Sequence, residues 1–146
     1  YWKRTSPAPA MMAFDAAKRD VCRVQREKTS SPLQALVLLN GPQYVEAARG
    51  LSERLTEQFG TDQVRAAIST AFQMMTSRKP DADEIDVLQE LYDQQLEYFV
   101  GDPARAKAYL NIGRAPADTA IDQNHLAAMT VLTGALMNYD QTMMKR

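Results

Sequence analysis

Apolar residues recur every three or four positions along most of this sequence, in segments that open at a capping residue or a proline and often close at a glycine. This spacing places apolar side chains on one face of a helix. The clearest start is Ser31-Pro32-Leu33-Gln34, in which Ser31 can cap the helix, Pro32 can occupy its first turn and Gln34 can complete a capping box. The sequence therefore predicts a helix that begins at Pro32.

Similar signals predict the remaining helices. Asn40-Gly41-Pro42 should end the first helix and start the next, and Thr61 is the expected N-cap of a later one. Asp81-Ala82-Asp83-Glu84 offers a second capping box, and Asp102-Pro103 repeats the pattern of a cap followed by proline. We expect helices from Pro42 to about Gln58, from about Asp62 to Met75, from Asp81 to before Gly101, from Pro103 to before Gly113, and from about Gln123 into the region of Met143. No strand pattern competes with them. The predicted fold is all-α, a compact bundle-like domain of five or six helices.

Residues 1–30 differ from the rest of the chain in pattern and charge. They lack a sustained apolar period and are expected to be mostly irregular. They carry seven Lys or Arg against three Asp or Glu, whereas residues 31–146 carry ten basic against fifteen acidic residues. We therefore divide the chain into a basic N-terminal segment, residues 1–30, and a helical domain, residues 31–146. The segment is expected to lie on an acidic surface of this chain or of a preceding domain, and a simply solvated basic stretch is the alternative.

Composition excludes several classes of function. The 146 residues have a formal charge of -1, which removes the whole-chain argument for nucleic-acid binding. Cys22 is the single cysteine, so an intrachain disulfide or a CxxC redox pair cannot form. The apolar stretches near residues 35–39 and 127–137 fall short of the roughly 20 residues that a membrane helix needs. We expect no nucleic-acid partner and no membrane span.

Side chains that could carry chemistry are few. His125 is the only histidine, which excludes histidine clusters for zinc and favours a surface or packing role. Glycines show no phosphate-binding pattern. Acidic residues on the expected helix 81–100 repeat at the spacing of one solvated face: Asp83, Asp86, Glu90, Asp93 and Glu97. We therefore expect no catalytic residue, no metal ligand and no cofactor within this chain.

The densest group of polar side chains lies just before the helix at Pro32. We take Asp15, Cys22, Arg26 and Thr29 as candidate binding residues. In one interpretation they fix a seam to an upstream domain, with Arg26 as the anchor because its planar guanidinium can bind carboxylates or carbonyls in a forked geometry. In the other they contribute to an enzyme or redox site shared with upstream domains, because cations next to a cysteine lower its thiol pKa. A buried structural role for Cys22 is a third reading.

The same region carries a family resemblance. Phe14-Asp15, Cys22, Arg26 and Thr29, followed by the run from Pro32 to Leu36, Leu39-Asn40 and Pro42, resemble the planctomycete-type domain of unknown function 1553. Arg78 and Pro80 fit an Arg-x-Pro step of that family, and the run from Leu136 to Asp140 is similar to its closing motif. Gly41, Met137 and Tyr139 are small departures from the pattern.

The resemblance implies a larger exported bacterial protein of which this chain is the C-terminal portion. It implies an extracytoplasmic location, a further domain of unknown function upstream and often a cytochrome c module, with a loose genomic association to polysaccharide use. It implies no reaction. The leading interpretation is a non-catalytic helical interaction domain whose partners are the upstream domains of the same polypeptide.

Overall fold

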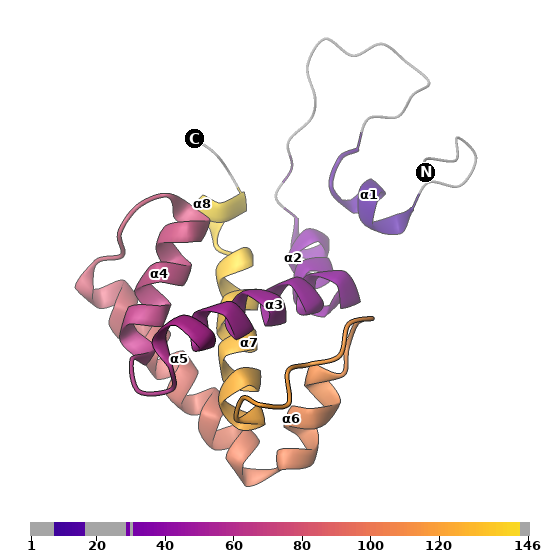
Figure 1. The fold of residues 1–146 in the computed structure, drawn as a ribbon. Helices are drawn as coiled ribbons and strands as arrows, with labels where there is room; N and C mark the ends of the chain where they lie inside the picture. Colours follow the sequence, from indigo (N-terminus) through magenta and orange to yellow (C-terminus); the bar gives the residue numbers. More distant parts are fainter. Residues whose placement is uncertain (1–7, 17–28, 30, 144–146) are drawn as a thin grey trace, which may run out of the picture.

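The chain folds as an all-α domain, as the sequence predicts. The computed structural model describes residues 8–16, 29 and 31–143, and this part of the chain contains helices and no strand (Figure 1). The helices are α1 (Pro9–Ala13), α2 (Pro32–Asn40), α3 (Pro42–Phe59), α4 (Val64–Thr76), α5 (Ala82–Gly101), α6 (Pro103–Leu110), α7 (Gln123–Met137) and α8 (Asp140–Met143). None of these helices is both long enough and apolar enough to span a membrane.

The break between α2 and α3 has a local cause. Ser31 caps α2 in a reciprocal capping box with Gln34, and Pro32 occupies the first turn, as predicted. Gly41 adopts an extended conformation between the two helices, and Pro42 then opens α3. A Cβ at Gly41 would lie 2.6 Å from the carbonyl oxygen of Val37, so only glycine fits the sharp turn without displacing backbone.

Helices α4 to α6 follow the predicted order with two corrections, at the starts of α4 and α6. Thr61 is not an N-cap, because Gly60 turns the chain at φ 69° and a turn continues beyond it, so α4 begins at Val64 behind Gln63. Asp81 caps α5 in a second capping box with Glu84, as the sequence predicts. Asp102 precedes Pro103 of α6 as expected, although its carboxylate pairs with Arg105 instead of capping the helix.

Helix α7 is the centre of the domain. It packs against α2, α3, α4, α5, α6 and α8, and Figure 1 shows it running behind α3 with α5 and α6 around it. The sequence predicts one apolar face for this helix, but the structure buries nearly its whole circumference. Its buried residues are His125, Leu126, Ala127, Ala128, Met129, Thr130, Leu132, Thr133, Gly134 and Leu136. A central helix needs small and apolar residues on every side, which weakens the periodic pattern.

The described residues of the N-terminal segment include one short helix. Residues Pro9–Ala13 form α1 within a segment that the sequence predicts to be mostly irregular. The ring of Phe14, which follows α1, lies 6.0 Å from the ring of Tyr44 on α3, measured between centroids. Residues 1–7, 17–28 and 30 lie outside the described part.

Candidate functional site

Two of the four predicted binding residues meet beside the start of α2. Thr29 donates to one carboxylate oxygen of Asp15 twice, from its backbone N–H at 2.8 Å and from its hydroxyl at 2.6 Å. These hydrogen bonds lower the pKa of Asp15 below its ordinary value, the hydroxyl contributing most. Cys22 and Arg26, the other two predicted residues, lie outside the described part of the chain.

Gln34 joins this pair to both flanking helices. Its side-chain amide donates to the carbonyl of Ala13 at the end of α1, at 2.8 Å, and to the Thr29 hydroxyl at 3.1 Å. Its amide oxygen accepts from the N–H of Ser31 at 3.0 Å in the capping box. Gln34 is only 3% exposed, so it cannot exchange these partners for water. Gln34, which completes the capping box of Ser31, is thus also the link that holds α1 and the Asp15–Thr29 pair against α2.

The outer side of this junction is apolar. Leu33, Leu36 and Leu39 of α2 are 58%, 57% and 48% exposed, and their three-residue spacing places them on one side of the helix. Met11 and Met12 of the neighbouring α1 are also exposed. Five of the nine exposed large apolar side chains of the described residues thus belong to these two short helices. We call these five residues the α1–α2 apolar surface.

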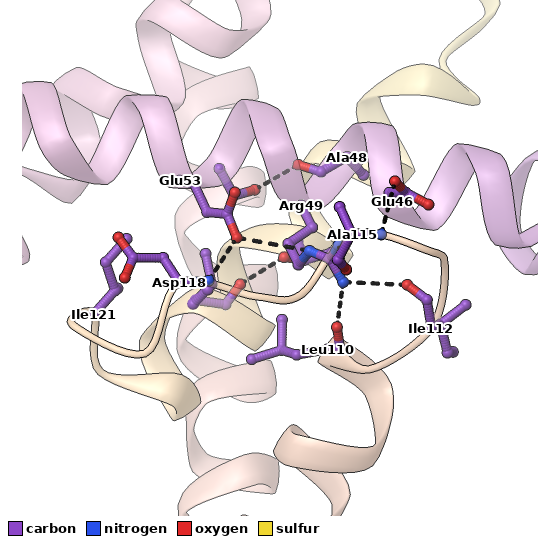
Figure 2. Close-up of polar contacts among 12 residues, drawn as sticks. Glu46, Ala48, Arg49, Glu53, Leu110, Ile112, Ala115, Asp118 and Ile121 are labelled. Atoms are coloured by element: carbon purple, nitrogen blue, oxygen red, sulfur yellow. Dashed lines mark hydrogen bonds and ion pairs between the residues drawn. The ribbon is translucent and has the colours of Figure 1, made fainter.

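A second polar cluster fixes the loop between α6 and α7, and Figure 2 shows it in close-up. The guanidinium of Arg49 on α3 donates to the carbonyls of Leu110, of Ile112 at 3.1 Å and of Ala115 at 2.6 Å. Arg49 is 2% exposed, and its charge is balanced by Glu53, whose carboxylate lies 3.6 Å from its Nε. The first carbonyl ends α6, and the other two belong to the long connection to α7, whose backbone groups need partners.

Two glutamates on the same face of α3 also bind the loop, and we call Glu46, Arg49 and Glu53 together the α3 clamp. Glu46 accepts hydrogen bonds from the backbone N–H groups of Arg114, at 2.7 Å, and Ala115, at 3.2 Å, and these bonds lower the pKa of its carboxyl. Glu53 accepts from the backbone N–H of Asp118, at 3.1 Å (Figure 2). Sequence reasoning missed this function for Arg49. Two features of the sequence could have indicated it. The connection before residue 123 is long and has no periodic apolar pattern, and residues 46, 49 and 53 place three charges on one face of α3.

The only histidine is a buried link between helices. The Thr56 hydroxyl donates its hydrogen to the backbone carbonyl of Ser52, at 2.9 Å. The oxygen of this hydroxyl therefore accepts from Nε2–H of His125, at 3.1 Å. Nδ1 of the neutral ring is then the acceptor for the Tyr92 hydroxyl at 2.7 Å. Burial lowers the pKa of His125 and raises that of Tyr92 to about 12. Both ring nitrogens are engaged and the side chain is 5% exposed, an arrangement that serves packing of α3, α5 and α7.

Carboxylates do not converge on a metal site in the described residues. No group of three or more His, Cys, Asp or Glu there could hold a metal ion. The acidic residues of α5 are exposed at all five positions of the predicted solvated face.

Comparison with known proteins gives a family and no function. A family model described as PSD1, protein of unknown function (DUF1553), matches residues 1–92. This range contains the motifs from Phe14 to Pro80 that carry the resemblance, while the closing run at Leu136 lies beyond it. No curated protein and no solved structure matches the chain.

Proposed function

We propose that this chain, which belongs to the PSD1 family of proteins of unknown function (DUF1553), is a non-catalytic helical interaction domain within a larger exported protein. Its role is to bind the upstream domains of the same polypeptide through the α1–α2 apolar surface. The observation that carries the proposal is the concentration of exposed leucines and methionines on α1 and α2. Exposed apolar patches on a folded domain commonly mark protein interfaces.

The rigidity of the junction supports an interaction role. Gln34 holds α1 against α2 by part-buried hydrogen bonds, and the Asp15–Thr29 pair adds charge-assisted ones, so the apolar side chains are presented on a fixed frame. A preformed surface loses less conformational entropy on binding than a flexible one. The buried polar clusters at Arg49 and His125 contribute by stabilising the bundle that supports this surface.

Site-specific photo-crosslinking in the full-length protein tests the proposal. A benzophenone amino acid in place of Leu36 should crosslink to a peptide from the region upstream of this domain, identified by mass spectrometry. The same amino acid in place of Val100, which is 58% exposed at the end of α5, serves as the control and should give no such crosslink. Crosslinks from Leu36 only to a second copy, or none above the control, would contradict the upstream partner.

A double substitution separates binding from folding. Leu36→Ser with Leu39→Ser removes exposed side chains, so the free energy of unfolding of the isolated chain should change by less than about 1 kcal/mol. Contact between the domain and the upstream region, measured by the crosslinking yield from a benzophenone at Leu33, should fall. A large loss of stability instead would show that the leucines belong to the core.

A further inference from the structure

A cavity opens on the opposite part of the fold, between α4, α5 and α7. Its volume is about 360 Å³, and it is lined by Phe72, Asp83, Glu84, Val87, Leu88, Ala135, Leu136 and Tyr139. Small-molecule sites begin at about this volume, roughly 300 Å³. Figure 1 shows the three helices that frame it, with α8 above them.

The walls of the cavity are almost entirely carbon and include two aromatic rings. The centroids of Phe72 and Tyr139 are 5.7 Å apart, and the rings are inclined at 50°. Val87 on the α5 side is 65% exposed, so the cavity is open to solvent there. An apolar body of modest size can therefore enter and contact ring and aliphatic surface.

One of the two carboxylates at the cavity is already saturated. Glu84 accepts from both terminal nitrogens of Arg78, at 2.5 and 2.7 Å, from the Tyr139 hydroxyl at 3.0 Å and from the N–H of Asp81 at 3.0 Å. The Tyr139 hydroxyl and the charge of Arg78 are engaged in the same cluster, so neither is offered to a ligand. The Arg78 guanidinium also lies over the Phe72 ring, 4.7 Å from its centroid, so this face of the ring already has a cation on it.

Asp83 is the carboxylate that remains. It is exposed at the edge of the cavity and forms no hydrogen bond or ion pair with the described residues. No Lys or Arg occurs between Asp81 and Val100, so a negative group placed here would meet carboxylates without a cation on the same helix. A positive group would gain a partner.

We infer that this cavity binds a small organic cation, whose apolar body lies against Phe72 and Tyr139 and whose ammonium or guanidinium group pairs with Asp83. The two rings and the aliphatic side chains offer carbon surface to the apolar body, and the carboxylate at the rim adds direct charge pairing. The inference is independent of the α1–α2 apolar surface, because it uses residues of other helices.

Three probes of similar shape and different charge test it: phenethylamine, phenethyl alcohol and phenylacetate. Each is titrated into the protein at neutral pH while backbone amide signals are followed by ¹H–¹⁵N NMR. Phenethylamine should produce saturable shifts at Val87, Leu88, Ala135 and Leu136. It should bind about two- to fivefold more tightly than the alcohol, the range of an exposed ion pair, and phenylacetate should bind most weakly.

Matched substitutions locate the binding. Val87→Trp should block the cavity and abolish the shifts, whereas Val100→Trp on the same helix should leave them unchanged. Asp83→Asn should bring phenethylamine to the affinity of the alcohol, while Asp93→Asn, ten residues along the same helix, should retain the preference for the cation. No saturable shift with any probe, equal affinity for the anion and the cation, or equal behaviour of the two tryptophan variants would overturn the inference.

Discussion

Arg49 is the residue on which the loop between α6 and α7 depends most. From a side chain that is 2% exposed, it donates to the carbonyl of Leu110 at the end of α6 and to the loop carbonyls of Ile112 and Ala115. Truncating it leaves those carbonyls and Glu53 without their cation. We expect Arg49→Ala to lower the free energy of unfolding by about 2 to 4 kcal/mol, measured by urea denaturation. Arg54→Ala, an exposed site on the same helix, should stay within about 0.5 kcal/mol. An equal loss of unfolding free energy in the two variants would contradict the role of Arg49 in holding the loop.

His125 makes stability depend on pH. Burial lowers its pKa in the folded state below the ordinary value of 6.5, so the unfolded chain binds the proton more readily. The contribution of the neutral His125 ring to the free energy of unfolding is therefore fully present above pH 6.5. It declines as the pH falls from 6.5 toward the lower pKa that the ring has in the folded protein. Urea denaturation between about pH 7.5 and 5.5 should show this decline. His125→Gln should remove most of this slope, whereas identical slopes in the two proteins would contradict the assignment.

At the level of helices, two glycines of the α2–α3 region should respond oppositely to the same substitution. Gly41→Ala forces a methyl group to within 2.6 Å of a backbone oxygen and should destabilise the protein by about 1 to 3 kcal/mol. Gly50 lies inside α3 with nothing within 4 Å of an added Cβ, so Gly50→Ala should stabilise by about 0.5 to 1 kcal/mol. Thermal melts of both variants give the signs, and a shared sign would contradict the steric account.

The same helices show which features sequence alone can predict. The starts of α2, α3 and α5 were predicted correctly because caps and prolines act within one turn of the chain. The Thr61 cap was wrong because a turn after Gly60 was indistinguishable from a helix start. Arg49 was missed because a buried arginine and a solvated one look alike between Glu46 and Glu53. The meeting of Asp15 with Thr29 could be suspected from their grouping, while its dependence on Gln34 follows only from the packing of α1 against α2.

On the scale of the whole molecule, α7 should be the most protected element. It is enclosed by six other helices, while α1 and α8 are short and contain no buried residue. Exchange from the centre of α7 therefore requires the domain to unfold, whereas α1 and α8 can open locally. Hydrogen–deuterium exchange followed by mass spectrometry should show the slowest amides in α7 and fast amides in α1 and α8. Protection of α1 equal to that of α7 in the isolated domain would contradict this order.

The central position of α7, near the end of the chain, also affects when the domain can fold during translation. Ribosomes make α1 to α6 first, and the side chains of α3 and α5 that finally rest on α7 have no core to enter until it emerges. The residues matched by the family model end at Tyr92, in the middle of α5, and leave α7 out. A polypeptide that ended at that point would carry the motifs from Phe14 to Pro80 without α7. The apolar faces that pack on α7 in the complete domain would then be exposed to aggregation and proteolysis.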